Sequence, residues 1–224
     1  MTEKKAINYK SCFDIIGPIM VGPSSSHTAG AVQLGLLARQ LFGGTPKEVC
    51  CTYYESFAET HLGHGTDYAI VSGVLGFATD DTRVPQAVDI AKSQGITITF
   101  IEKEGESPIN HANTADLWLS DEDHTVRLVG ASVGGGTVEV RAVEVDGIFS
   151  VVTGPLPVIV LLTAQEERHQ RLLEELKNQE IEVLKVRHEK DLYVYELGSL
   201  LTRIPYQHIT EVFKQDRMYI LNPH

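Results

Sequence analysis

The segment at residues 22–31, Gly-Pro-Ser-Ser-Ser-His-Thr-Ala-Gly-Ala, constrains the fold most because it leads from a loop into a helix. Pro23 restricts the glycine before it to extended conformations, and the three serines that follow are natural helix caps. From Ala31 the apolar residues recur at helical spacing until the pair Gly43-Gly44 ends the element. These apolar residues are Leu34, Leu37, Ala38 and Leu41. We therefore predict a loop that feeds directly into a helix N-terminus.

The chemistry of this segment favours an anion site. A helix N-terminus presents unpaired N–H groups and the positive end of the helix dipole, and Ser24, Ser25, Ser26 and Thr28 add hydroxyls. The dipole disfavours a charged imidazole, so we predict that His27 is neutral and accepts a proton. The simpler alternative is that Ser26 only caps the helix and the other serines are solvated.

A second motif, Gly-His-Gly-Thr-Asp at residues 63–67, repeats this logic. We predict a flexible glycine loop that opens a helix over residues 68–77, with His64 left accessible by the glycines on both sides. Histidine takes a proton near neutral pH, and Asp67 is expected to orient the imidazole. The alternative is an exposed turn histidine with Asp67 as a helix cap.

A third short polar segment is His-Ala-Asn-Thr at residues 111–114, just before a predicted strand. Asn113 offers both a donor and an acceptor, which suits a zwitterion. The presence of both histidine motifs in one chain favours a shared cleft.

The distribution of charge limits the function classes. The net charge of −11 argues against a surface for nucleic acid or anionic membrane. No apolar run reaches about 18 residues, so neither a signal peptide nor a transmembrane helix is expected, and we predict a cytoplasmic protein. Lysine and arginine are absent from residues 11–38 and 48–82, which contain both histidine motifs. An anion bound there would meet N–H groups, hydroxyls, imidazole or an external cation.

The three cysteines do not form a metal-binding pattern. Cys12, Cys50 and Cys51 give no even disulfide framework and no Cys-x-x-Cys motif. Cys50 and Cys51 are neighbours in a predicted strand and should point to opposite faces, as buried small hydrophobic residues. If this protein works with a metal cluster, another chain must hold it.

The order of elements predicts two domains and an α+β (mixed α/β) fold class. In residues 1–150, a mixed-sheet domain is expected, with strands near 48–57, 96–101, 115–119, 125–129 and 137–145 and a helix from Pro85 to Gly95. The last three strands are expected to be antiparallel, and the triplet at 134–136 indicates a bulge or a close approach of another backbone or ligand.

Residues 151–224 are predicted to form a small βαββαβ domain of the ferredoxin-like type. The turn signals Asp146-Gly147 and Gly154-Pro155 suggest the boundary near residue 150. The predicted strands are 158–162, 181–186, 192–197 and 218–221, with helices at 166–178 and 205–214.

Together these motifs resemble the iron-sulfur-dependent L-serine dehydratases, specifically the beta chain of the two-chain bacterial form. The resemblance spans roughly residues 10–147 and rests on the segments 13–20, 22–31, 56–60, 63–67, 111–115 and 132–136. It implies conversion of L-serine to pyruvate and ammonia, with a four-iron four-sulfur (4Fe-4S) cluster held by cysteines of an alpha chain. The open iron would bind the substrate carboxylate and hydroxyl as a Lewis acid.

The resemblance also implies roles for individual residues. The catalytic set would be His64, Asp67 and His27, with His64 as the base that removes the α-proton and Asp67 as the residue that orients it. The substrate-binding set would be Ser24, Ser25, Ser26, Thr28, Thr66 and Asn113. This chain itself is expected to supply no metal ligand.

The sequence departs from the family at a few places. Leu62 stands where the family often has lysine, and Ala112 where it often has proline. Family beta chains end in an amino-acid-sensing ACT domain whose first loop contains glycine, whereas residues 162–167 here contain none. We therefore expect an ACT-like domain and favour a role in dimerisation or docking over a role in serine sensing. The expected assembly is a homodimer or a heterotetramer with the alpha chain.

Two other function classes stay open. One is a non-catalytic regulatory subunit that binds an amino acid, although sensing alone does not require two imidazoles in glycine-rich loops. The other is a serine hydrolase that uses Ser26 and His64, although the chain contains no Gly-x-Ser-x-Gly motif.

Overall fold

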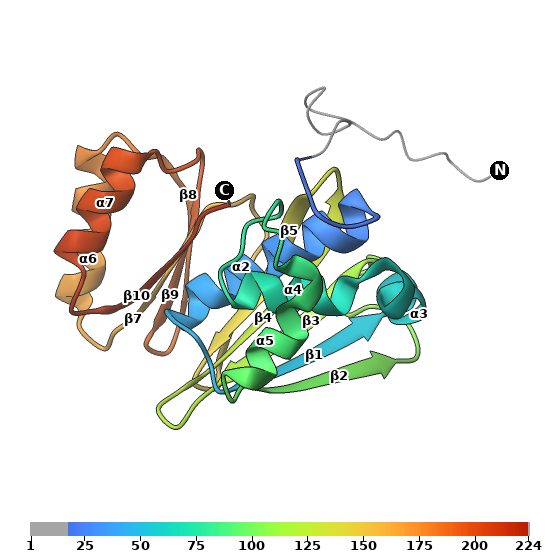
Figure 1. The fold of residues 1–224 in the computed structure, drawn as a ribbon. Coiled ribbons are helices and arrows are strands. Elements are labelled where there is room, and N and C mark those ends of the chain that lie inside the picture. Colours follow the sequence, from blue (N-terminus) through green and yellow to red (C-terminus); the bar gives the residue numbers. More distant parts are fainter. Residues whose placement is uncertain (1–17, 224) are drawn as a thin grey trace.

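The computed structural model describes residues 18–223 and contains two β-sheets with helices packed against them (Figure 1). The larger sheet has six strands in the order β2-β1-β3-β4-β5-β6, and the smaller has four in the order β10-β7-β9-β8. In the larger sheet β1 and β2 run parallel, and the other neighbouring strands are antiparallel. This architecture confirms the α+β fold class, including the predicted antiparallel set.

The predicted elements of the larger unit appear in the predicted order, and two further elements, α3 and β6, were not predicted. Its strands are β1 (Glu48–Tyr54), β2 (Thr97–Lys103), β3 (Thr114–Ser120), β4 (Thr125–Gly134), β5 (Thr137–Val145) and β6 (Ile148–Val151). Its helices are η1 (Ser25–Ala29), α2 (Gly30–Phe42), α3 (Glu55–His64), α4 (Thr66–Val74), η2 (Val84–Gln86) and α5 (Ala87–Ser93). Figure 1 shows α2, α4 and α5 on one side of the six-stranded sheet.

Helices α2 and α4 cross with their backbones in close approach. A Cβ atom added at Gly35 would lie 2.2 Å from the Ile70 carbonyl oxygen, and one at Gly73 would lie 2.1 Å from the Val32 carbonyl oxygen. The apolar residues predicted for α2 are all buried. Because this contact leaves no room for side chains, it fixes the relative position of two helices whose N-termini carry candidate site residues.

The predicted glycine triplet forms the turn between β4 and β5. The strand register shifts between Ser132 and Gly134, which confirms a bulge, and Gly135 and Gly136 have φ values of 61° and 82°. Two consecutive left-handed residues are what a tight hairpin of this twist requires. A Cβ at Gly136 would also lie 2.8 Å from Pro18 Cδ, so another segment does come close here.

The smaller unit has the predicted βαββαβ order. Its elements are β7 (Val158–Leu162), α6 (Glu166–Asn178), β8 (Val183–Glu189), β9 (Leu192–Leu197), α7 (Arg203–Val212) and β10 (Arg217–Leu221). One face of its sheet packs against α6 and α7 through residues such as Ile159, Leu172 and Phe213. On the other face, Val160 and Val194 join the same hydrophobic cluster as α2.

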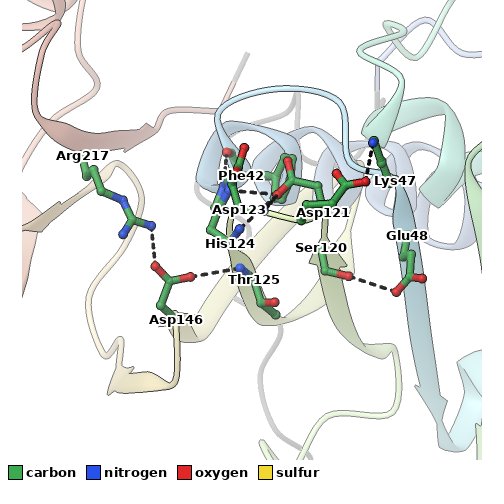
Figure 2. Close-up of polar contacts among 11 residues, drawn as sticks. Phe42, Lys47, Glu48, Ser120, Asp121, Asp123, His124, Thr125, Asp146 and Arg217 are labelled. Atoms are coloured by element: carbon green, nitrogen blue, oxygen red, sulfur yellow. Dashed lines mark hydrogen bonds and ion pairs between the residues drawn. The ribbon is translucent and has the colours of Figure 1, made fainter.

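Polar contacts also join the two units at the C-terminal end of α2. Gln40 Nε2 donates to the Asn222 carbonyl oxygen at 3.1 Å, and Asn222 N donates back to Gln40 Oε1 at 3.0 Å. Figure 2 shows Arg217 of β10 reaching Asp146, with Nη2 and Oδ2 2.6 Å apart, while Asp146 accepts from Thr125 N. Within the larger unit, His124 Nε2 lies 2.9 Å from the Phe42 carbonyl oxygen at the end of α2. The smaller sheet is therefore held against α2.

The prediction for residues 55–67 is wrong in detail. The strand ends at Tyr54, and the supposed glycine loop is mostly helix, because α3 continues through Gly63 and His64. Only Gly65, with φ 70°, interrupts the chain before α4 begins. The segment buries few apolar side chains, so its sequence shows little helical periodicity, whereas its glycines are typical of a loop.

Some predictions fall on residues 1–17 and 224, which lie outside the described residues. These include Cys12 and the first part of the segment 13–20 that carries the family resemblance. Among the residues that are described, no helix is long and apolar enough to cross a membrane.

Candidate active site

The three predicted motifs come together in the structure. Thr28 Oγ1 donates a hydrogen bond of 3.0 Å to the His64 carbonyl oxygen, and the rings of His27 and His64 lie 4.8 Å apart between centroids. Asn113 reaches the same region through β4, since its Nδ2 lies 3.4 Å from the Ser132 carbonyl oxygen. Direct contacts between elements distant in sequence thus bring the three motifs into one region.

The serine-rich segment starts a helix earlier than predicted. Ser24 is the N-cap, and its Oγ accepts from His27 N at 3.1 Å, so Ser24 rather than Ser26 caps the helix. A π-helical turn, η1, then leads into α2 without a break. In the first turn of a helix the amides have no intrahelical acceptor, and Ser25 and Ser26 occupy that turn here. Ser25 and Ser26 are half-buried.

Both ring nitrogens of His27 face hydroxyls. Nδ1 lies 3.4 Å from Ser24 Oγ, and Nε2 lies 3.3 Å from Ser56 Oγ. Burial, and then the nearby His64, hold the pKa of His27 below its ordinary value. Hydroxyls donate or accept, so they satisfy a neutral imidazole in either tautomer. This agrees with the prediction of a neutral His27, and Ser56 is a contact that the sequence reasoning did not assign to the site.

His64 has a buried ring nitrogen with no hydrogen-bond partner. Its Nδ1 is one of five such side-chain atoms among the described residues, together with atoms of Gln33, Tyr53, Thr66 and Ser132. A buried polar atom left unpaired costs about 1–3 kcal/mol, so such atoms need an explanation. Three of the five, His64 Nδ1, Thr66 Oγ1 and Ser132 Oγ, belong to the motifs that meet here.

Asp67 does not orient His64, contrary to the sequence-based prediction. Its Oδ1 lies 2.7 Å from Nδ1 of His61, one helical turn before His64. The second ring nitrogen of His61 lies 2.7 Å from Glu102 Oε1 on β2. His61 faces Asp67 because α3 continues through His64, so that the break at Gly65 places the start of α4 beside the preceding turn.

Asn113 and Ser132 form a small polar unit next to the start of α2. Ser132 N donates to the Asn113 carbonyl oxygen at 3.0 Å. Ser132 is buried against Gly30, where an added Cβ would lie only 2.0 Å from Ser132 Oγ. Thr66, predicted to bind substrate, is completely buried at the start of α4. Ser132 belongs to the segment 132–136 that carries the family resemblance, but its place in the site and its contact with Gly30 were not predicted, because both depend on packing between β4 and the helix.

The residues present do not fit a metal cluster. Within residues 18–223, no group of three or more His, Cys, Asp or Glu side chains is arranged to hold a metal ion. Cys51 is completely buried while Cys50 is partly exposed, which confirms that the two point to opposite faces of β1. Burial raises the pKa of both thiols, which disfavours the thiolate that a metal requires.

The arrangement is suited to accepting a proton beside a bound anion. The imidazoles of His27 and His64 lie beside a helix N-terminus, and the hydroxyls of Ser24 and Ser56 face the His27 ring. His61, which lies on the same helix as His64, contacts the carboxylates of Asp67 and Glu102.

Comparison with known proteins gives a consistent picture. A family model described as serine dehydratase beta chain matches residues 11–142. The chain is 47% identical over 156 residues to "Probable L-serine dehydratase, beta chain" of Bacillus subtilis (strain 168), covering 70% of this chain and 69% of that relative. It is 36% identical over 156 residues to "L-serine dehydratase, beta chain" of Peptoniphilus asaccharolyticus, covering 67% of each.

A longer relative matches over a smaller share. "L-serine dehydratase" of Haemophilus influenzae (strain ATCC 51907 / DSM 11121 / KW20 / Rd) is 37% identical over 162 residues, covering 57% of this chain and 33% of that relative.

Proposed function

The chain belongs to the serine dehydratase beta-chain family, and from this we propose that it is one part of an enzyme that converts L-serine to pyruvate and ammonia. The single observation that carries the proposal is the meeting of His27 and His64, 4.8 Å apart, beside the N-terminus of η1. A proton acceptor next to an anion site is what removal of the α-proton of an amino acid requires.

We assign the role of base to His64. Its Nδ1 makes no hydrogen bond, whereas both nitrogens of His27 lie near hydroxyls, so the His64 ring is less committed to partners within the protein. His27 supports it by staying neutral, since a charge on either ring opposes a charge on the other. The proton taken from the α-carbon would rest on the His64 ring.

The substrate carboxylate is assigned to the amides and hydroxyls of Ser25 and Ser26 at the helix N-terminus. Asn113 uses Nδ2 toward Ser132, which leaves Oδ1 as an acceptor for the substrate ammonium. Thr28 holds His64 in place through the backbone and is therefore a positioning residue rather than a substrate ligand. Loss of the α-proton and of the β-hydroxide gives aminoacrylate, whose hydrolysis yields pyruvate and ammonia.

A 4Fe-4S cluster, with its Lewis-acid chemistry, is proposed to belong to an alpha chain and to complete the site from outside. Two observations support a partner. The relatives from Bacillus subtilis and Peptoniphilus asaccharolyticus are both named as beta chains, a name that implies a second kind of chain. Apolar side chains also stand exposed on segments that carry the site: Ile19 is 84% exposed, Leu62 77% and Val133 42%. Exposed apolar groups gathered near a functional site are typical of an interaction surface.

The test is anaerobic reconstitution with an alpha chain from the same genome, with pyruvate formation from L-serine as the measurement. We expect no turnover by the isolated chain and turnover by the reconstituted pair. Turnover by the isolated chain would contradict the two-chain arrangement. Serine binding without turnover by the pair would instead favour a non-catalytic, amino-acid-binding subunit.

A further inference from the structure

We propose that His61 is a positioning residue, held as an imidazolium between Asp67 and Glu102, that fixes the junction of α3 and α4 and with it the ring of His64. The part of this inference that concerns catalysis rests on the proposed role of His64. We use the word clamp for the two contacts of His61, with Asp67 and with Glu102, and these contacts are independent of that role.

The geometry around His61 requires two donors. The side chain is buried, with 5% of the residue exposed, and its two ring nitrogens each lie 2.7 Å from a carboxylate oxygen. Ionised carboxylates only accept hydrogen bonds, and a neutral imidazole has only one N–H group. Both contacts are therefore satisfied together by the doubly protonated ring, as charge-assisted hydrogen bonds.

The two carboxylates come from different elements. Asp67 lies in the first turn of α4, and Glu102 lies on β2, so His61 ties α3 to both. Between His61 and Asp67 the chain passes through Gly65, whose φ of 70° makes it the point where the backbone turns. A Cβ at Gly65 would lie 2.0 Å from Tyr68 Cζ, so the turn is closely covered. The clamp spans this turn, and His64 is the residue directly before it.

An uncharged phenol also faces His61. Tyr53 of β1 lies with its ring centroid 4.9 Å from that of His61, and burial, with Cys51 and Asp67 nearby, raises the pKa of its phenol well above the usual range. Burial by itself lowers the pKa of His61, but the hydrogen bonds and charges of Glu102 and Asp67 outweigh it, so that the pKa is raised. Asp67 is largely shielded, with 17% of its side chain exposed, whereas Glu102 is 62% exposed.

Loss of the proton from His61 would release one side of the clamp. A deprotonated nitrogen would then face a carboxylate oxygen with both carrying lone pairs, so one carboxylate must move away. The junction would loosen and the His64 ring would lose its fixed orientation. Because misplacement of a catalytic group affects the chemical step more than substrate binding, kcat should fall at alkaline pH while KM changes little.

The test uses the full chain labelled with ¹³C and ¹⁵N at histidine, titrated by NMR, alone and with the alpha chain. We expect the His61 ring to carry protons on both nitrogens beyond its ordinary pKa, and the His64 signals to shift at the pH where His61 titrates. Glu102→Gln keeps a hydrogen-bonding group but removes one charge, so it should move both events to lower pH together.

Replacement of His61 by asparagine and by glutamine gives a matched pair of variants. His61→Asn retains a donor near the Nδ1 position, toward Asp67, whereas His61→Gln retains one near the Nε2 position, toward Glu102. Because the contact with Asp67 spans Gly65, His61→Asn should keep more turnover than His61→Gln, which should lose about ten- to a hundredfold in kcat with KM little changed.

The outcomes separate the inference from the proposed function. A His61 ring that titrates at or below its ordinary value, or His64 signals that ignore the His61 titration, would overturn the inference even if the enzyme dehydrates serine. A coupled titration in a pair that makes no pyruvate would support the clamp and contradict the function. If kcat falls at alkaline pH in all variants just as it does in the wild type, His61 has only a structural role and the inference is wrong.

Discussion

The crossing of α2 and α4 gives the sharpest stability prediction, through Gly35→Ala. Gly35 lies in the middle of α2, and the new methyl group would sit 2.2 Å from the Ile70 carbonyl oxygen, with Gly73 Cα and Val74 N both at 3.0 Å. Every one of these neighbours is backbone, so no side chain can rotate away. The two helices must separate to admit the methyl group.

The size of the effect follows from two opposing terms. Overpacking costs typically 1–3 kcal/mol, and the backbone clash places this case near the upper end, at about 3 kcal/mol. Replacing glycine by alanine within a helix returns about 1 kcal/mol. The net loss in the free energy of unfolding is thus about 2 kcal/mol, or roughly 4–8 °C in Tm for a chain of this size.

Gly63→Ala is the matched control. Gly63 also lies in a helix, α3, but nothing stands within 4 Å of the position of its added Cβ. It should therefore stabilise the chain by about 0.5–1 kcal/mol. Urea unfolding followed by circular dichroism measures both variants. A Gly35→Ala chain as stable as Gly63→Ala would refute the backbone-contact reasoning.

Three further predictions follow from the site and from β1. His64→Asn should lower kcat for pyruvate formation by the reconstituted pair by about a hundredfold or more, and an unchanged kcat would remove His64 as the base. Because the pKa of His61 is raised, its contribution to stability is fully present below about pH 6.5 and is lost as pH rises through the folded-state pKa. The urea midpoint of the wild type should fall over this pH range, and that of His61→Asn should not. The pKa of His27 is lowered, so His27 changes stability only at more acidic pH and leaves this range unchanged. A thiol reagent should modify Cys50 before Cys51 in the native chain, since Cys51 is completely buried, and peptide mass spectrometry that finds equal rates would contradict the burial of Cys51.

The sequence was sufficient where local patterns carry the information. The helix that ends at Gly43, the alternating strands and the βαββαβ order of residues 158–221 were all predicted from periodicity and turn residues. The meeting of His27 with His64 was also anticipated, because both motifs precede helices and share the same chemistry.

The sequence failed where a contact depends on distant partners. Helix α3 was missed because its glycines resemble a loop and its buried face is short. Asp67 was paired with the wrong histidine, since the choice between His61 and His64 is made by the turn at Gly65. Glu102 lies 41 residues from His61, and nothing in the local sequence links them.

The way α2 is shared has a consequence for how such chains diversify. One end of this helix carries the imidazole motif, and its other end exchanges amide hydrogen bonds with Asn222 of the smaller unit. A chimera in which residues 151–224 are replaced by those of a relative would therefore have a poorly matched interface between the two units. The matching surface of α2 would have to be exchanged as well. Experiments that exchange parts between such chains should therefore transfer α2 and the four-stranded sheet together.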